Sequence, residues 1–488
     1  MKQSKKAIVI GAGVAGLASA IRLKLKGFEV NVYEAQPQPG GKLNRIKIGG
    51  YSFDTGPSLF TMPHFIEELF DLAGKDISNY FSYIKSDIAC HYFFEDGTRF
   101  NFYTEAHRRK KEFNNVFSDD VENIERYLTK SAYIYEKTKN TFLEKSLHKI
   151  NTYLNKDILS TIFAIPNLGL FTTLHNRNKK SFKNKKLVQV FDRYATYNGS
   201  NPYKTPGIMS LIPHLENGIG TFLPKNGMFD IVEALYSLAK DIGVVFHFNQ
   251  KVERVIVEKN TISGIVLSGV RIEADLIFCN VDIKIAYQKL LKDVRIPKSV
   301  LSQEPSSSAL IFYWGIKKEF KELGLHNIFF SNDYKKEFEL IFKKGEVIDD
   351  PTVYINITKK FVDNDAQEGC ENWFVMVNVP YDSGQDWGII RKELRKNILI
   401  KLSRILKVDV ERLIEEEEYL DPLRIEEKTS SYAGALYGSS SNSQTAAFFR
   451  NPNFSKIKGL YFVGGSVHPG GGIPLCLLSA KIATSIVK

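Results

Sequence analysis

Apolar and polar residues along the first forty positions follow an order that predicts a strand, a helix and a second strand. Residues 6–10 form a short apolar run, and residues 29–33 form another that ends at Glu34. Between them, small and apolar side chains recur at helical spacing, at Ala15, Leu17, Ala18, Ile21 and Leu25. Gly27 follows as a suitable helix C-cap. This stretch therefore predicts a β-α-β unit.

The end of the chain repeats this order. Residues 459–463 are an apolar run, glycines then cluster as far as Gly472, and Ile473 and Pro474 open an apolar segment. We expect a strand, a glycine-rich turn and a helix here. Two such units at opposite ends of the chain predict one domain that both termini build around a long ligand.

The middle of the chain contains further periodic segments. Residues 228–239 show one apolar helical face that Gly243 ends, and residues 251–257 and 261–267 predict a hairpin with its turn near Lys259 and Asn260. Residues 274–280 predict a strand that returns to the first sheet. Apolar, β-branched and aromatic runs predict strands of a second sheet at 310–314, 353–357 and 373–379. The charge run Glu415–Glu418 predicts a solvated helix end.

Glycine spacing supplies the candidate chemistry. Gly11, Gly13 and Gly16 have the G-x-G-x-x-G spacing, in which the glycines allow a tight turn, close approach to a pyrophosphate and helix–strand packing. The helix start around Ala15 would direct its N–H groups and dipole at phosphates. Glu34 stands where a ribose hydroxyl would be held. These residues predict a dinucleotide site, and the alternative is a nucleotide-free α/β unit.

A second set of glycines follows Glu34. Gly40, Gly41 and the cation Lys42 come first, and Gly56, Pro57 and Ser58 come after residues 53–55. This spacing suits a cofactor whose far phosphate and ribityl chain continue past the first turn. The alternative is that the glycines at 40–41 and 49–50 form hairpin turns.

Length and composition add bounds to this picture. The 488 residues suggest two domains or one domain with a large insertion. Four separate cysteines without a C-x-x-C pair favour a reducing compartment, and the nine histidines show no metal spacing, so no metal is predicted. The nucleotide-type unit begins almost at once, which leaves no room for a cleavable signal within this sequence.

The net charge of +11 is concentrated in two clusters. Residues 108–111 are all basic, and Arg177, Lys179, Lys180, Lys183, Lys185 and Lys186 follow the apolar residues 158–171. The apolar stretch is shorter than the about 20 residues of a membrane-spanning helix. An apolar anchor with a basic flank is typical of a segment that lies in a bilayer surface, and the alternative is a core helix followed by a solvated loop. Nucleic acid is not an expected partner, because no binding motif is present.

These motifs together resemble the flavin amine oxidase and carotenoid desaturase superfamily. The residues that carry the resemblance are Glu34, Gly40-Gly41-Lys42, Asp54–Ser58 and, in the centre of the chain, residues 223–228. Residues 462–474 are similar to the bacterial phytoene desaturase signature. The sequence departs from the family pattern at three positions. Lys42 stands where an arginine is common, Asn226 where a glycine is common, and Cys476 where the motif often has a small apolar residue. Residues 191–203 look closest to the branch that desaturates hydroxylated carotenes at the 3,4 bond.

The resemblance implies FAD as cofactor and an α/β fold. It implies a Rossmann-like FAD-binding domain (1–75, 218–290 and 455–488), a mixed-sheet substrate domain (76–103, 191–217 and 291–454) and a helical membrane-associating segment (104–190). The FAD ligands would be the residues of the two glycine sets with Glu34, the backbone around Val252, and Gly465, Gly472, Ile473 and Pro474. The protein would be a peripheral protein on the cytoplasmic side of a membrane.

The implied activity is desaturation of an acyclic or hydroxylated carotene, by hydride transfer to flavin N5 and loss of a proton. Oxygen or a membrane quinone would reoxidise the flavin. Alternatives are a phytoene desaturase and a redox-neutral flavin-dependent carotene isomerase. His468 is a candidate for taking the proton or for stabilising the glycine-rich turn. Arg193 is a candidate for orienting a substrate hydroxyl or for pairing with an acid such as Asp192.

Overall fold

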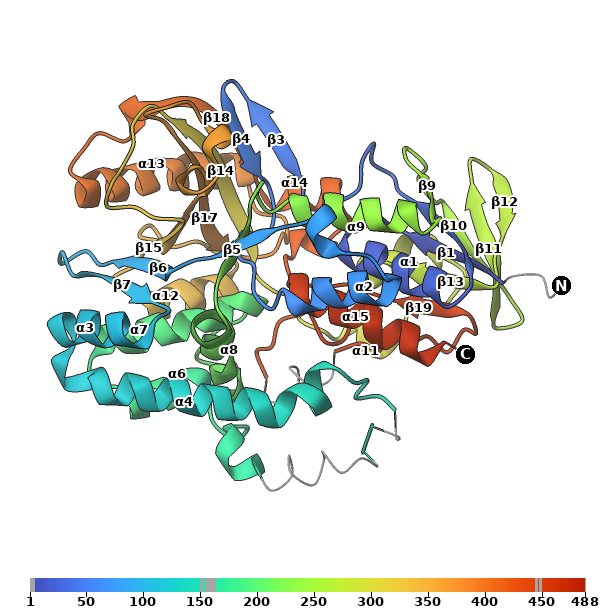
Figure 1. Ribbon diagram of the computed structural model, residues 1–488, viewed down its shortest axis with the longest axis horizontal. Coiled ribbons are helices and arrows are strands. Elements are labelled where there is room, and N and C mark those ends of the chain that lie inside the picture. The colour runs from blue at the N-terminus through green and yellow to red at the C-terminus, as the bar shows by residue number, and fades with distance from the viewer. Residues whose placement is uncertain (1–4, 150–151, 154–163, 444–445, 447–449, 488) are drawn as a thin grey trace.

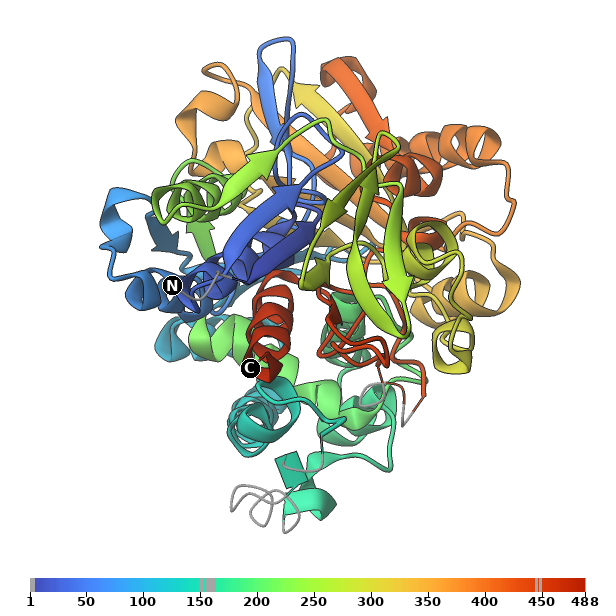
Figure 2. The ribbon, with the colours of Figure 1, turned by 90° about the vertical axis from the view of Figure 1, so that its right-hand side faces the viewer.

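The structure is a computed structural model that describes residues 5–149, 152–153, 164–443, 446 and 450–487. Figure 1 shows two sheets beside each other, with a layer of helices beneath the upper-left one. The described ends of the chain lie on the same side of the molecule, next to the right-hand sheet, as Figures 1 and 2 both show.

The first sheet is parallel and has five strands in the order β19-β13-β1-β2-β9. Its strands come from three distant stretches of the chain, and they are β1 (Lys6–Ile10), β2 (Glu29–Tyr33), β9 (Val245–His247), β13 (Leu276–Cys279) and β19 (Leu460–Phe462). The predicted strands at both termini and at 274–280 are confirmed. Because all five strands are parallel, their carboxyl ends meet at one edge, and β1 lies where the connections diverge to either side.

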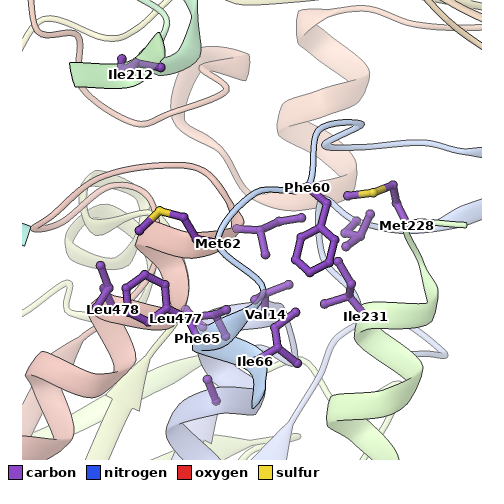
Figure 3. Close-up of a cluster of buried hydrophobic side chains, with 14 of the residues drawn as sticks. Val14, Phe60, Met62, Phe65, Ile66, Ile212, Met228, Ile231, Leu477 and Leu478 are labelled. Atoms are coloured by element: carbon purple, nitrogen blue, oxygen red, sulfur yellow. The ribbon is translucent and has the colours of Figure 1, made fainter. Parts of the chain in front are cut away.

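Helices cover one face of this sheet. They are α1 (Val14–Leu25), α2 (His64–Ala73), α9 (Asp230–Asp241) and α15 (Ile473–Ile486). Figure 3 shows Val14 of α1, Ile66 of α2, Ile231 of α9 and Leu477 of α15 among the side chains that gather between these helices. All four are buried, so the helices are fixed relative to one another by a shared apolar core.

The opposite face is covered by a three-stranded antiparallel sheet of β10 (Arg254–Glu258), β11 (Thr261–Leu267) and β12 (Val270–Glu273). Its apolar residues share a core with Ile8 and Ile277 of the parallel sheet. The predicted hairpin is confirmed, and Lys259 and Asn260 form its turn with positive φ values of 48° and 61°. Such values fit a tight hairpin turn.

The second sheet has seven strands in the order β18-β14-β17-β16-β15-β6-β7, antiparallel except for the parallel pair β15 and β6. The strands are β6 (Ile88–Phe93), β7 (Arg99–Tyr103), β14 (Ser308–Ile316), β15 (His326–Phe329), β16 (Val353–Ile357), β17 (Glu371–Val379) and β18 (Ile414–Leu420). Helix α13 (Trp387–Leu406) packs on one face through Leu394, Ile398 and Leu402. The predicted strands at 310–314, 353–357 and 373–379 are confirmed, and so is the α/β fold with a mixed second sheet.

The prediction of a helix end at Glu415–Glu418 is wrong. These residues lie in edge strand β18, where Glu416, Glu417 and Glu418 pair with β14. Arg395 and Arg424 neutralise two of the carboxylates, at 2.9 and 2.6 Å. Charged side chains suit an edge strand because they oppose pairing with a further chain.

A helical segment lies beneath the second sheet (Figure 1). It comprises α3 (Ala106–Val116), α4 (Val121–Thr138), α6 (Leu174–Ser181) and α7 (Lys185–Asp192). The predicted helical character is confirmed for these residues, while residues 158–163 of the predicted anchor lie outside the described residues. Among the described helices, none has both the length and the apolar composition needed to cross a bilayer.

Short elements complete the described fold. The strands are β3 (Arg45–Ile48), β4 (Tyr51–Asp54), β5 (Tyr83–Lys85) and β8 (Phe222–Pro224), and the α-helices are α8 (Ile212–His214), α10 (Ile283–Ile285), α11 (Lys298–Leu301), α12 (Tyr334–Glu339) and α14 (Pro422–Thr429). The turns that concern the site are η3 (Lys139–Leu143), η5 (Arg193–Asn198), η6 (Gly207–Leu211) and η7 (Leu215–Ile219).

Candidate active site

The first glycine turn joins β1 to α1 and leaves no space for side chains. Gly11 has φ +95°. A β-carbon on Gly16 would lie 2.0 Å from the carbonyl oxygen of Gly11, and one on Gly13 would lie 2.8 Å from the side-chain amide of Asn280. Gly13 caps α1 without a side-chain hydrogen bond. The turn therefore presents bare backbone at a helix N-terminus, which suits a pyrophosphate.

Glu34 lies at the carboxyl end of β2, where the sequence predicts a ribose contact. Two backbone N–H groups fix its side chain. Oε2 accepts a hydrogen bond from the Ala12 N–H at 2.7 Å, and Oε1 accepts one from the Gln36 N–H at 2.9 Å. The residue still borders the cavity described below. A carboxylate fixed in this way keeps lone pairs for ribose hydroxyls.

The second glycine pair packs directly on the first turn. The Gly40 N–H donates to the Ala12 carbonyl at 3.0 Å, and a β-carbon on Gly41 would lie 3.4 Å from the Cα of Gly13. These glycines lie between β2 and β3, which belong to different sheets, so the alternative reading of residues 40–41 as a hairpin turn is wrong. It holds for the glycines at 49–50, which connect β3 to β4.

Lys42 lies half-buried beside this pair. Its Nζ donates to the carbonyl oxygens of Leu436 and Ala435, at 2.6 and 3.2 Å. Burial lowers the pKa of Lys42, and the Asp282 carboxylate opposes this shift. The lysine thus connects the glycine pair to the segment before the C-terminal turn.

The loop of Gly56, Pro57 and Ser58 leaves β4 and lies against Lys42. A β-carbon on Gly56 would lie 2.0 Å from the Lys42 carbonyl oxygen. Asp54, just before this loop, accepts hydrogen bonds from the Met228 and Phe229 N–H groups at 2.5 and 3.2 Å. One carboxylate therefore ties the loop to the start of α9.

The C-terminal turn faces the first turn across the edge of the sheet. Gly464 and Gly472 both have φ +105°, and a β-carbon on Gly465 would lie 3.1 Å from Gly471. Ser479 Oγ accepts a hydrogen bond from the Gly464 N–H at 3.1 Å. Gly472 then caps α15, whose first turn contains Pro474. This start is again a helix N-terminus without a side-chain cap.

One cavity of about 1100 Å³ connects these elements. Every cofactor residue predicted from the sequence borders it except Gly16, namely Gly11, Gly13, Ala15, Glu34, Gly40, Gly41, Lys42, Gly56, Pro57, Ser58, Val252, Gly465, Gly472, Ile473 and Pro474. Gly16 packs behind the turn, against Gly11. The volume is slightly above the about 300–1,000 Å³ of typical ligand pockets.

The same cavity continues between the seven-stranded sheet and the helical segment. Ile311, Phe374 and Met376 border it from the sheet, and Ile208, Leu211, Ile212 and Leu215 border it from the turns opposite. Its wall here is mostly apolar. A cluster of polar side chains around Arg193 interrupts it.

Arg193 lies in this wall, but its acid is not Asp192. Arg193 Nη2 donates to both carboxylate oxygens of Glu216 at 3.2 Å. Asp192 instead contacts His175 and Asn178, at 2.7 and 2.8 Å. The predicted pairing of Arg193 with an acid is confirmed, but the acid is Glu216 and not Asp192, because consecutive side chains on this helical turn point to different neighbours.

His468 is buried and does not border the cavity. Its Nε2 lies 2.9 Å from the Lys145 carbonyl oxygen, and its own carbonyl accepts a hydrogen bond from Asn453 Nδ2 at 2.8 Å. Burial lowers the pKa of His468 to about 4, so the ring is neutral near pH 7. This placement favours the role in stabilising the turn.

The sequence analysis missed several residues of the site. Asn280 follows β13 at the edge where the parallel strands end; with its amide oxygen towards the first turn, it accepts hydrogen bonds from the Gly13 and Gly16 N–H groups at 3.3 and 3.2 Å. Its position after a parallel strand is a signal that could have identified it. Glu216, His326 and Tyr354 also border the cavity, and no local pattern marks them.

Glu337, in α12, makes the stability of the protein depend on pH, and it contacts Thr352, which borders the cavity. It is 1% exposed and accepts hydrogen bonds from Thr352 at 2.8 and 3.1 Å. Burial raises the pKa of Glu337 from 4.5 to about 7. The native carboxyl keeps its proton to a higher pH than the unfolded chain does, so unfolding releases a proton between these two values. The contribution of this group to the free energy of unfolding is fully present below the unfolded-state pKa of 4.5, and it is lost as pH rises through the native pKa of about 7.

We therefore expect the free energy of unfolding to fall more between about pH 5 and about pH 7 in the wild type than in Glu337→Gln protein. The difference in slope can reach about 1.4 kcal/mol per pH unit. Urea unfolding at each pH measures it. Equal slopes for the two proteins would show that Glu337 does not keep a proton in the native state.

The fold and the site define a flavoprotein oxidoreductase. The chain belongs to the family described as flavin containing amine oxidoreductase, whose pattern matches residues 14–487. FAD is accordingly its cofactor, and the glycine turns and Glu34 fit that molecule because they leave side-chain-free backbone and a fixed carboxylate along the cavity.

Two curated relatives and one solved structure are similar over nearly the whole chain. A 1-hydroxycarotenoid 3,4-desaturase of Flavobacterium sp. (strain P99-3) is 53% identical, over 99% of this chain and 99% of the relative. A 4,4'-diapolycopene oxygenase of Methylomonas sp is 31% identical, over 98% and 97%. The crystal structure of an oxidoreductase from Methanosarcina mazei has a TM-score of 0.66 at 16% identity, over 97% and 98%, and supports the fold.

Proposed function

We propose that the protein is an FAD-dependent carotenoid desaturase that introduces the 3,4 double bond into a 1-hydroxylated acyclic carotene. The observation that carries the proposal is the continuity of the cavity, which extends from the glycine turns into a mostly apolar chamber with a polar cluster around Arg193. A hydrocarbon with one hydroxylated end matches such a chamber. The similarity to the Flavobacterium desaturase supports the same substrate class.

Desaturation removes two hydrogens from adjacent carbons, one as a hydride equivalent and one as a proton. Bound FAD supplies the acceptor for the hydride. The chain itself contributes orientation and the exclusion of water. The apolar side chains of Ile208, Leu211 and Ile212 on one wall and Phe374 and Met376 on the other border the chamber, so a polyene would be held without competing polar contacts. Reoxidation by oxygen or a membrane quinone stays a prediction.

A panel of carotenes tests the proposal. FAD-loaded protein is mixed with liposomes that contain phytoene, neurosporene or a 1-hydroxylated acyclic carotene, and the rate of substrate loss is followed for each. We expect the hydroxylated chain to react fastest. Faster and repeated reaction with phytoene would move the protein to the phytoene branch and contradict the proposal.

We also propose that the helical segment docks on an anionic membrane surface, on the cytoplasmic side. Phe171 is 80% exposed and precedes α6, whose lysines Lys179 and Lys180 are exposed. An exposed aromatic side chain next to lysines suits the boundary between acyl chains and headgroups. The other basic cluster contributes less, because Arg109 is buried in an ion pair with Glu125 at 2.9 Å.

Membrane docking predicts that replacing Lys179, Lys180, Lys183 and Lys185 with Gln weakens binding to anionic liposomes by a factor of roughly ten or more, since each lysine near headgroups contributes on the order of 1 kcal/mol. These four are exposed, whereas Lys186 pairs with Asp96. Co-sedimentation with vesicles measures the binding. The matched control replaces four exposed lysines elsewhere, Lys259, Lys298, Lys392 and Lys396. Equal sedimentation of the wild type and the variant that lacks Lys179, Lys180, Lys183 and Lys185 would overturn the docking proposal.

A further inference from the structure

Arg193 is a buried cation in the wall of the apolar chamber. Its side chain is 10% exposed, and it borders the cavity. Nη2 donates to Glu216 and to the Tyr92 hydroxyl, the latter at 2.8 Å. The rings of Tyr92, Tyr194 and Tyr197 surround the guanidinium, with their centroids 5.5, 4.7 and 5.4 Å from its carbon. The group is thereby fixed in position.

Glu216 has no capacity left to satisfy the remaining donors of this arginine. It is 1% exposed and also accepts hydrogen bonds from the hydroxyls of Tyr194, at 3.0 Å, and Tyr197. Among the described residues, nothing accepts a hydrogen bond from the buried Nε of Arg193. A buried donor without a partner is costly, so this donor points to a ligand that supplies an oxygen.

His326 in β15 adds a second donor without a partner. Its Nδ1 lies 2.7 Å from the Tyr354 hydroxyl and 3.3 Å from Asn356 Nδ2. Because an amide N–H faces Nδ1, the proton of the neutral ring is assigned to Nε2, which has no partner among the described residues. Burial lowers the pKa of His326 to about 3, and the positive charge of Arg193 adds to that shift. The ring is therefore neutral, and the arginine is close enough to affect it.

We propose that Arg193, together with His326, binds the terminal hydroxyl of the substrate chain and so selects hydroxylated carotenes. The inference rests on the proposed function. A hydroxyl oxygen accepts hydrogen bonds from these donors, whereas the end of a plain hydrocarbon leaves them unsatisfied in a desolvated site. Sites built to hydrogen-bond a substrate hydroxyl discriminate strongly against the analogue that lacks it.

The same anchor accounts for the position of the new double bond. Tyr354 connects His326 to the loop of Gly56, Pro57 and Ser58, because its hydroxyl lies 2.8 Å from Ser58 Oγ. The polar cluster therefore adjoins a loop that borders the cofactor end of the cavity. In a 1-hydroxylated chain, a single carbon lies between the hydroxyl-bearing carbon and the 3,4 bond. A hydroxyl held here keeps that bond, and no distant one, beside this loop.

Arg193→Lys protein tests the inference. Lysine keeps a positive charge opposite Glu216 but loses the forked set of N–H donors. We expect kcat/KM for the 1-hydroxylated carotene to fall on the order of 10- to 100-fold, as for the loss of a hydrogen bond to a charged group. The inhibition constant of the same chain without the hydroxyl should stay the same. The matched control is Arg109→Lys, a buried arginine that pairs with Glu125 and does not border the cavity, and it should change neither value.

The outcomes separate the inference from the proposed function. If the wild type desaturates no hydroxylated carotene, the proposed function fails. If it does and Arg193→Lys protein with normal flavin content keeps the wild-type kcat/KM, the assignment of Arg193 is overturned. If this variant does not retain FAD, the inference is tested with the wild-type protein and a carotene that is hydroxylated at one end only. Desaturation next to the hydroxyl supports the anchor, and equal desaturation at both ends overturns it.

Discussion

Gly13→Asp protein will be purified without FAD and will show no desaturase activity. A β-carbon at this position would lie 2.8 Å from the side-chain amide of Asn280, so the turn must shift to admit any side chain. The new carboxylate would also stand at the N-terminus of α1, in the place that suits a pyrophosphate. Steric exclusion and charge repulsion therefore act at the same point.

The ratio of flavin to protein absorbance measures this effect. Gly74→Asp is the matched control, because Gly74 is an exposed helix C-cap with φ +64° and no atom within 4 Å of an added β-carbon. Aspartate tolerates this left-handed conformation better than most residues, so the control should keep its FAD. Stoichiometric flavin in Gly13→Asp protein would show that the pyrophosphate lies elsewhere.

Asp54→Ala protein is expected to lose about 3 kcal/mol of unfolding free energy and much of its FAD. The carboxylate has 6% of its side chain exposed, and it accepts hydrogen bonds from the N–H groups of Met228 and Phe229 and from Arg45. Its removal leaves two backbone donors and one cation without their acceptor. The loop of Gly56, Pro57 and Ser58 would then no longer be tied to α9.

Asp54→Asn protein provides the comparison for this prediction. Its amide keeps one oxygen acceptor, so about half of the loss is expected. Urea unfolding gives the free energies, and flavin absorbance after gel filtration gives the retained FAD. If alanine and asparagine variants were both as stable as the wild type, Asp54 would not connect the loop to α9 in the way described.

Local patterns predicted the parts of the site that consist of backbone turns. Gly11, Gly13 and Gly40 could be predicted because a turn without side chains depends on glycine within a few residues. The turn at Lys259 and Asn260 could be predicted because this polar pair separates two runs rich in β-branched residues. The parallel sheet followed from recognising the same strand, turn and helix order at both termini.

Residues that meet only through tertiary packing could not be predicted. Glu216 lies 23 positions after Arg193, in a turn without a distinctive pattern, and the two meet only in the folded chain, at the wall of the cavity. His326 comes from the middle of the chain and reaches the site because β15 pairs with β16, where His326 lies opposite Asn356. Glu415–Glu418 were assigned to a helix because a charge run alone does not distinguish an exposed helix from an edge strand.

The mass of the product from a 1-hydroxylated acyclic carotene tests the central claim most directly. FAD-loaded protein is incubated with liposomes that contain this carotene, and the product is examined by mass spectrometry and visible absorption. The desaturase account predicts the loss of two hydrogens together with a red shift. A spectral change at constant mass would indicate an isomerase, and a gain of oxygen would place the activity with oxygenases such as the Methylomonas relative. Either result would contradict the account.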